Sequence, residues 1–413
     1  MRCQPDALPI CAAATRNPVC SIPKPTASFM SSDKHITVLL LEDSVIAARL
    51  VEHLLKSSLP DHTLLKVETL QDGMEQLDRN PAIDAVLLDL NLPDSSGLAT
   101  FKKVHDHRSS APIVILSGDS DEAQAVEAVR RGAQDYLVKS RFDENHLSRA
   151  IRFALERAHR QHMEHEVAGA ERVQQLLYPA SAPEVTGYDI AGAAFPAEHV
   201  SGDYFDFIPM SGGRIGIIVR DVSGHGLAPS LKMAETRAYL HALTYETASA
   251  AGRLTNIDLA QVLTRTNELL LTSPTWQFVS LFFLCLDPAR STYTYASAGH
   301  EAWHLKSDRS LAVLDATGPI LGVIKDAEFS NTKPATLAEG EMLILATDGF
   351  VEAMNADNEL FGKQRMMDVI QHDSQATSET ILNNTWHAAC EFSGGAPQAD
   401  DMTGVVIRRL KDE

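Results

Sequence analysis

Residues 36–139 alternate short apolar runs with amphipathic stretches, and this pattern predicts repeated β–α units. Strands are expected at 36–41, 83–88, 111–118 and 135–139, with helices at 45–55 and 70–77. The strand runs are continuously apolar, which is typical of strands that are covered on both faces in a parallel sheet. This part of the chain is therefore predicted to form a doubly wound α/β domain.

From residue 188 the pattern changes to strands interrupted by two helical stretches. Strands are expected at 188–197, 214–222, 278–286, 291–297, 311–314, 342–347 and 404–409, and helices at 227–243 and 258–271. A sandwich of two sheets flanked by helices would bury the apolar faces of such a set. The predicted fold class of the whole chain is α/β.

Between the two patterns, residues 144–178 are rich in good helix formers and contain Gly169 as their one glycine and no proline. Two apolar seams with alternating four- and three-residue spacing follow each other, one through Leu147, Ile151, Ala154 and Ala158, the other through Met163, Val167, Ala170, Gln174 and Leu177. A homodimeric coiled coil would use both seams. An amphipathic helix packed against its own domains explains them equally well.

Length, charge and cysteine content narrow the class of protein. The 413 residues suffice for two or three domains, and the net charge of −19 argues against a nucleic-acid partner. No apolar run approaches the roughly 18–20 residues that span a bilayer, so the chain is not expected to cross a membrane. The five cysteines do not form a disulfide framework, which indicates a reducing cytoplasm. Residues 1–33 are predicted to be a disordered leader, with Met30 as the true start.

Polar residues follow the strands of the first domain. Because ligands gather at the carboxyl ends of parallel strands, one site is expected to contain Glu42, Asp43, Asp89, Ser117 and Lys139. The three carboxylates can bind Mg²⁺, and the hydroxyl and ammonium groups can contact a phosphoryl group. One carboxylate can act as the nucleophile that accepts it.

This set, with the segments LLDLNLPDSSG at 87–97 and RRGAQDYLVK at 130–139, resembles the response-regulator receiver domain, a (βα)5 fold, over about residues 35–141. The resemblance implies that Asp89 is phosphorylated by a histidine kinase or phosphotransfer protein. It also implies a Mg²⁺ held by Glu42, Asp43, Asp89 and the Asn91 carbonyl, and a switch formed by Ser117, Lys139 and Tyr136. Ser140 departs from the family, which usually has proline there.

Four aspartates of the second half each lie where an apolar strand gives way to a Gly-rich or polar turn: Asp203, Asp221, Asp348 and Asp400. Any one of them alone reads as a turn or cap residue. The set in this order indicates a site for hard divalent cations, which prefer oxygen ligands. Two such ions about 3.5–4 Å apart can activate water against a phosphate ester.

These segments, with SAGHEAW at 297–303 and FG at 361–362, resemble the PPM (protein phosphatase 2C-like) phosphatases of the RsbU/SpoIIE class over about residues 181–410. The resemblance implies an αββα sandwich with two Mn²⁺ or Mg²⁺ ions. Their implied ligands are Asp203, the bridging Asp221, the Val222 carbonyl, Asp348 and Asp400, with Asp401 at the polar position beside the last. His225 and His300 are candidate acids, for which a hydrogen-bonded structural role is favoured.

The predicted organisation is a leader at 1–33, a receiver domain at 34–141, a helical linker at 142–180 that can form a coiled coil or homodimer, and a phosphatase domain at 181–413. The predicted function is a two-component response regulator whose output is metal-dependent Ser/Thr protein phosphatase activity, controlled through Asp89. The resemblance implies a STAS-type anti-anti-sigma protein as substrate. The alternative is an inactive phosphatase-like domain that acts as a binding adaptor for a sigma factor or anti-sigma partner. Retention of all four aspartates favours the enzyme.

Overall fold

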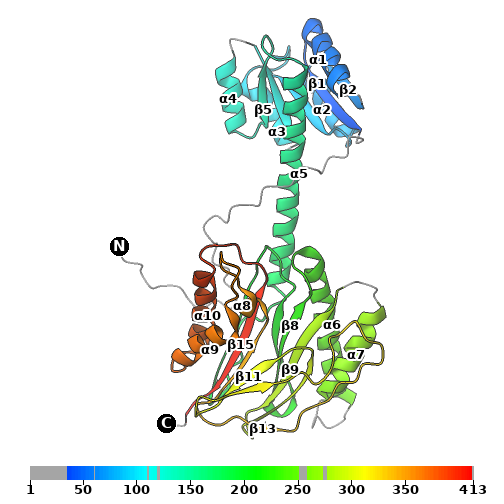
Figure 1. Ribbon diagram of the computed structural model, residues 1–413. Helices are drawn as coiled ribbons and strands as arrows, with labels where there is room; N and C mark the ends of the chain where they lie inside the picture. Colours follow the sequence, from blue (N-terminus) through cyan, green and yellow to red (C-terminus); the bar gives the residue numbers. More distant parts are fainter. Residues whose placement is uncertain are drawn as a thin grey trace. The chain divides into compact units, whose positions relative to one another are not determined.

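The described residues of the chain form two compact units that divide between Glu166 and Val167. The computed structural model describes residues 35–59, 61–108, 111–118, 121–250, 258–272 and 277–411, with the backbone alone for 246–250. The predicted leader at 1–33 and the predicted start at Met30 lie outside these residues. Figure 1 shows the elements of both units.

The first unit contains a five-stranded parallel sheet with strand order β2-β1-β3-β4-β5. Its strands are β1 (Ile36–Leu41), β2 (His62–Val67), β3 (Ala85–Asp89), β4 (Ile113–Ser117) and β5 (Asp135–Val138). Its helices are α1 (Val45–Ser58), α2 (Leu70–Arg79), α3 (Leu98–His107) and α4 (Glu122–Arg130), followed by the start of α5 (Glu144–Gln175). The prediction of a doubly wound fold is confirmed, although the sequence pattern did not reveal β2.

Both faces of this sheet are buried, as the continuous apolar runs predict. Along β1, Leu39 and Leu41 belong to the core on one face, and Val38 and Leu40 to the core on the other. Side chains alternate between the faces of a strand, so a strand that is buried on both sides needs apolar residues at every position. The edge strand β2 is only partly buried, and this explains its weaker apolar signal.

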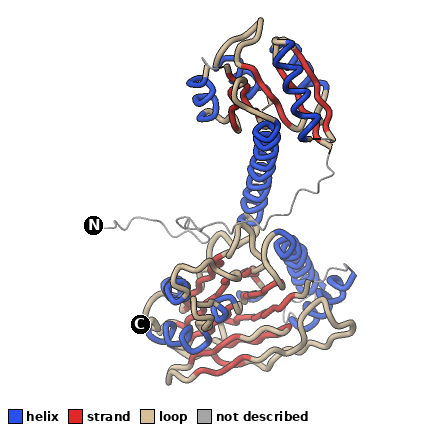
Figure 2. Tube along the Cα trace, turned by 45° about the horizontal axis from the view of Figure 1, so that its top comes forward, coloured by secondary structure: helices blue, strands red, loops and turns tan. Residues whose placement is uncertain are grey.

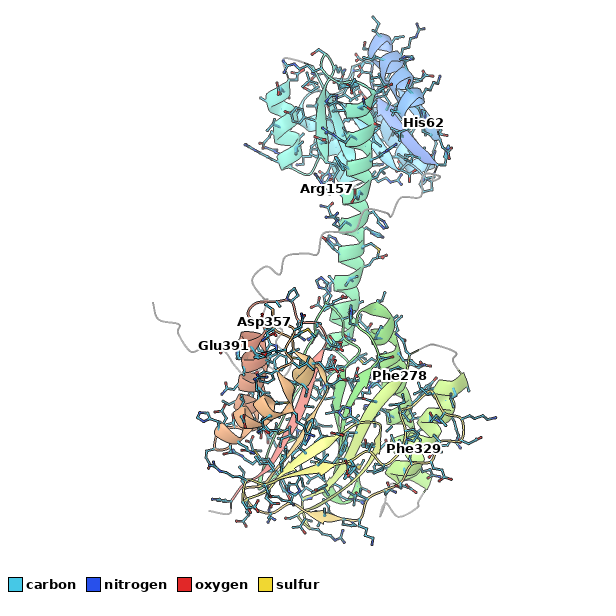
Figure 3. All side chains as sticks on the ribbon, viewed as in Figure 1. His62, Arg157, Phe278, Phe329, Asp357 and Glu391 are labelled. Carbon is cyan, nitrogen blue, oxygen red and sulfur yellow. The ribbon has the colours of Figure 1, made fainter. Side chains whose placement is uncertain are left out.

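Helix α5 begins in the core of the first unit and ends in the second. Leu147 and Ile151 are fully buried against the sheet, and Arg157, labelled in Figure 3, donates a 2.9 Å hydrogen bond to the Gln134 carbonyl. At the other end, Gln174 is buried in the second unit. The ends of the two predicted seams are therefore occupied by contacts within the chain, as the packed-helix alternative expects.

No helix in the described parts of the chain is long and apolar enough to cross a membrane.

The second unit contains two five-stranded sheets, ordered β13-β10-β9-β8-β7 and β12-β11-β14-β15-β6. The strands of the first are β7 (Tyr204–Pro209), β8 (Ile215–Val222), β9 (Val279–Asp287), β10 (Thr292–Ala298) and β13 (Ala335–Thr336). Those of the second are β6 (Tyr188–Phe195), β11 (Ala302–Leu305), β12 (Leu311–Leu314), β14 (Met342–Ala346) and β15 (Met402–Arg409). All of these pairings are antiparallel.

Helices cover the outer face of each sheet (Figure 2). Helices α6 (Leu227–Ala250) and α7 (Leu259–Thr272) pack on the first sheet. The second carries α8 (Gly349–Glu352), α9 (Gly362–His372) and α10 (Ser378–Phe392), and a 3₁₀ turn occupies Ser211–Gly213. The predicted αββα sandwich is confirmed, but the two helical stretches expected from the pattern were incomplete, because α9 and α10 form a whole outer layer.

The main core of the second unit lies between the two sheets. Val405 and Ile407 of β15 point into it, whereas Val406 points to the layer of α9 and α10. The sheets approach closely at Gly192, where an added β-carbon would lie 2.4 Å from the Phe205 ring. The alternation along each strand therefore sets which residues join the sheets and which bind the helices.

Replacing Ile151 by Ala should destabilise the first unit by about 2–5 kcal/mol, because Ile151 is fully buried in its core. Val173→Ala is the control on the same helix, since Val173 is 63% exposed and its loss should change stability by less than about 0.5 kcal/mol. Urea unfolding of the full chain measures both. Equal, small effects would contradict the packing of α5 on its own domain.

Candidate functional site

The first unit gathers three carboxylates at the carboxyl ends of its strands. Glu42 and Asp43 follow β1 and Asp89 ends β3, and they offer ligand atoms that all lie within 4.8 Å of one another. The backbone amide of Asn91 donates a hydrogen bond to Asp89 Oδ1 at 3.0 Å, which folds the following loop back toward the carboxylate. A compact set of hard oxygen donors fits a divalent cation such as Mg²⁺.

Lys139 neutralises part of this charge. Its Nζ lies 2.7 Å from Glu42 Oε2 and 2.6 Å from Asp89 Oδ2. Burial raises the pKa of Glu42, although the bond to Lys139 opposes the rise. For Lys139, burial lowers the pKa, but the bonds to Asp89 and Glu42 outweigh it and leave the pKa raised. The ammonium therefore stays charged beside Asp89. The bond between Lys139 and Ser140 is trans.

The two other predicted switch residues lie on neighbouring strands. Ser117 is buried at the end of β4, and its hydroxyl donates to the Gly118 carbonyl at 2.9 Å. Tyr136 on β5 donates to Glu122 Oε1 at 3.3 Å. The structure thus shows where both residues lie and what they contact, and their switching role remains a prediction.

In the second unit, strand register brings Asp203 and Asp221 together. Tyr204 on β7 is opposite Arg220 on β8. One step further along this antiparallel pair, Asp203 precedes Tyr204 and Asp221 follows Arg220, so the two aspartates lie side by side just before β7 begins and near the end of β8. Tyr204 and Arg220 point the other way, and the guanidinium lies 5.0 Å from the centre of the Tyr204 ring.

The other sheet delivers Asp348 and Asp400 in the same way. Ala346 of β14 is opposite Gly404 of β15, so the residues just after β14 lie beside those just before β15. The fit is close at Gly349, where an added β-carbon would lie 2.0 Å from the Asp401 carbonyl oxygen. A glycine is therefore needed directly after Asp348.

Side chains from the second sheet hold the Asp203 segment of the first. Thr347 Oγ1 donates to Asp203 Oδ2 at 2.7 Å. Both oxygens of Asp401 accept backbone bonds at 2.8 Å, one from Ala197 and one from Gly202. Thr347 was not predicted as a site residue, although its place directly before Asp348 was a usable signal. These bonds hold the Asp203 loop against the end of the second sheet that carries Asp348 and Asp400.

Crowding of the aspartates makes them poor anions in the absence of metal. Burial, followed by the charges of Asp348 and Asp400, raises the pKa of Asp221 to about 7. Burial and the charges of Asp221 and Asp401 raise the pKa of Asp203 well above its usual range. Carboxylates that repel one another in this way are suited to divalent cations, which remove the repulsion.

The arrangement is more open than in the first unit. Among the described residues, Glu42, Asp43 and Asp89 offer ligand atoms that all lie within 4.8 Å of one another. No three of Asp203, Asp221, Asp348 and Asp400 lie that close together in the described part of the chain. Two ions about 3.5–4 Å apart spread their ligands over a wider region than a single ion does. The predicted Val222 carbonyl lies beside them, since an added β-carbon at Gly202 would be 2.9 Å from it.

The two candidate acid histidines have different surroundings. His300 is buried, and burial lowers its pKa to about 4. Its Nδ1 lies 2.8 Å from the hydroxyl of Ser280, the residue opposite Asp221 on β9. A neutral, hydrogen-bonded imidazole fits the structural role, because near neutral pH it is not the imidazolium ion that would act as a general acid. His225 is half-exposed, with Nδ1 2.9 Å from Glu198 Oε1.

Comparison with protein families agrees with this geometry. Residues 38–152 match the response regulator receiver domain, and residues 211–410 match stage II sporulation protein E, SpoIIE. The chain therefore joins a receiver domain to a PPM-type phosphatase domain of the SpoIIE class. Members of this phosphatase class depend on divalent metal ions.

Among curated proteins, "Phosphoserine phosphatase RsbU" of Bacillus subtilis is 26% identical over 252 residues, covering 60% of this chain and 71% of RsbU. "Protein IcfG" of Synechocystis sp. is 27% identical over 264 residues, covering 59% of this chain but only 41% of IcfG. The solved SiaA-PP2C domain of Pseudomonas aeruginosa is 21% identical with a TM-score of 0.52, covering 61% of this chain and 98% of that domain. At this identity the match shows the fold alone.

The stability of the metal-free second unit should fall as pH rises from about 4 to about 7. Asp221 has an ordinary pKa of 3.8 and a folded pKa of about 7. In this window the folded state therefore keeps a proton that the unfolded chain releases, so raising the pH favours unfolding. Thermal unfolding in EDTA measures the effect, and Asp221→Asn should reduce it. Mn²⁺ should stabilise the wild type more at the upper end of the window. A metal-free protein that gains stability across this range would contradict the shift.

Proposed function

We propose that this chain is a response regulator in which the receiver controls a metal-dependent Ser/Thr protein phosphatase. The observation that carries the proposal is the convergence of four aspartates from two sheets, Asp203, Asp221, Asp348 and Asp400, whose crowding and mutual repulsion call for divalent cations. Two independent strand registers are needed to bring them to one end of the sandwich. Capping or turn roles do not require that coincidence.

In this proposal, two Mn²⁺ or Mg²⁺ ions would be held by Asp203, Asp221, Asp348, Asp400 and the Val222 carbonyl. When bound, such a pair supplies the positive charge that activates water and neutralises a phosphate ester. Other side chains of the protein position these ligands. Thr347 orients the Asp203 carboxylate, and Asp401 holds the backbone of the loop before it.

The receiver half of the proposal assigns Asp89 as the phosphoacceptor, with Mg²⁺ held by Glu42, Asp43, Asp89 and the Asn91 carbonyl. Lys139 already bonds Asp89 and Glu42 and is placed to contact the incoming phosphoryl group. Ser117 and Tyr136 would then respond to it. The donor would be a histidine kinase or a phosphotransfer protein, and a cytoplasmic location fits such a partner.

The proposed substrate is a phosphoserine or phosphothreonine on a STAS-type anti-anti-sigma protein. Similarity to a relative named as a phosphoserine phosphatase supports the residue type. The proposed domains are the receiver at 34–141, the helical linker at 142–180, which can also serve as a dimer seam, and the phosphatase at 181–413. Phosphorylation of Asp89 would act on the phosphatase through this linker.

Asp221→Asn should lower Mn²⁺-dependent hydrolysis of p-nitrophenyl phosphate and of a phosphoserine peptide by more than about 100-fold, because substitutions around metal ligands alone cost 10–100-fold. Asp357→Asn is the matched control, since Asp357, labelled in Figure 3, is exposed in a turn. Wild-type protein that hydrolyses neither substrate would favour the adaptor instead, and a variant as active as wild type would contradict the role of Asp221.

Acetyl phosphate with Mg²⁺ should change the turnover of the wild type and leave Asp89→Ala unchanged, because only the wild type can accept the phosphoryl group. Coupling between two sites is typically about 5–150-fold. The assay compares phosphatase rates before and after treatment, with aspartyl phosphorylation followed by intact mass. If the phosphorylated wild type and Asp89→Ala turned over at the same rate, the proposed control would be wrong.

A further inference from the structure

The last turn of α5 is bonded to the backbone of the Asp203 loop. The amide of Gln174 makes two hydrogen bonds with one residue, Ser201: Nε2 donates to the Ser201 carbonyl at 2.7 Å, and the Ser201 amide donates to Oε1 at 2.9 Å. Gln174 is 6% exposed and Ser201 is fully buried. A paired amide in a dry setting fixes both position and orientation of the backbone that it meets.

Tyr178, three residues after the end of α5, makes a second contact with the same loop. Its hydroxyl donates to the carbonyl oxygen of Asp203 itself, at 2.8 Å. Its ring packs against Tyr204 and Phe205, with ring centres 5.5 and 5.8 Å away. Gln174 and Tyr178 thus hold the backbone on both sides of Gly202, the residue before Asp203. We call this pair the linker clamp.

The clamp and the second sheet hold different atoms of the Asp203 loop. Thr347 and Asp401 reach the loop from the second sheet and bind the Asp203 carboxylate and the Gly202 amide. The clamp binds the Ser201 backbone and the Asp203 carbonyl from the α5 side. Together they leave the Asp203 carboxylate little freedom to turn away from Asp221. A ligand that is ordered before the cation arrives loses less entropy on binding it.

We propose that Gln174 and Tyr178 are positioning residues of the metal site, which set its affinity for divalent cations by holding Asp203 in place. The inference rests on the proposed role of Asp203 as a metal ligand. It also names the contact through which the proposed regulation would reach the metal site, because the helix that supplies Gln174 begins in the core of the receiver with Leu147 and Ile151.

A purely structural role for the clamp is the competing explanation, and the chain offers a matched comparison. Tyr188 lies in the same core as Tyr178 and is equally inaccessible, yet its hydroxyl has no hydrogen-bond partner among the described residues. Tyr178→Phe removes the bond to Asp203, whereas Tyr188→Phe removes a hydroxyl that bonds nothing. Both substitutions keep the ring and its packing.

Isothermal titration of the metal-free full chain with Mn²⁺ tests the inference. Heat that is absent from Asp221→Asn defines binding at the phosphatase site and separates it from the receiver site. Tyr178→Phe should raise the Mn²⁺ dissociation constant of this site by about 10-fold or more, the effect of losing a partner of a metal ligand. Tyr188→Phe should leave it unchanged. Unchanged affinity in a folded Tyr178→Phe protein would overturn the inference.

Gln174→Leu provides a second test, with Gln175→Leu as control, because Gln175 is the neighbouring glutamine on α5 and makes no bond to Ser201. Gln174→Leu should raise the Mn²⁺ concentration for half-maximal hydrolysis of p-nitrophenyl phosphate about 10-fold and regain the wild-type rate at saturating Mn²⁺. Normal Mn²⁺ affinity with a low maximal rate would overturn the inference. Wild-type protein without any Mn²⁺ heat at this site would refute the proposed function itself.

Discussion

Repulsion among crowded carboxylates, of which Asp203 is fully buried, is the constraint on which the second unit depends. Asp203 lies just before β7 and Asp221 near the end of the adjacent β8. Asp348 and Asp400 lie beside each other at the same end of the other sheet, and packing of the sheets brings these charges together. Such a set opposes folding at neutral pH unless protons or cations offset its charge. Bound cations would therefore stabilise the folded second unit by offsetting this charge.

The receiver offsets the repulsion among its carboxylates with a lysine side chain. Lys139 bonds both Glu42 and Asp89, so the cluster carries its own cation and the three carboxylates can stay close together. At the phosphatase site, the nearby buried cation is Arg220, whose guanidinium stacks on Tyr204 behind the aspartates and whose burial lowers its pKa to about 10. No lysine bridge comparable to Lys139 ties those aspartates together among the described contacts. Their spacing is set by backbone register instead.

Helix α5 is one continuous element that contacts both the receiver core and the loop before Asp203. Its first turns complete the receiver core through Leu147 and Ile151, and its last turn meets Ser201 through Gln174. The proposed regulation would pass along this helix, whose backbone hydrogen bonds are satisfied internally. The loop that it reaches is the one before Asp203, which is also held by Thr347. A small displacement there would act directly on a predicted metal ligand.

The sequence by itself determined the α/β class, the receiver sheet and the sandwich, because strand and helix periods are local properties of burial. It also placed Asp203, Asp221, Asp348 and Asp400 at strand ends. It missed β2, an edge strand whose exposed side weakens the apolar signal. Only the tertiary structure decided what the two ends of the linker helix contact within the chain and which side chains support Asp203. One spacing fits either self-packing or a coiled coil, and bonds such as Thr347 to Asp203 or Tyr178 to Asp203 join residues whose proximity arises from strand register and sheet packing rather than from local pattern.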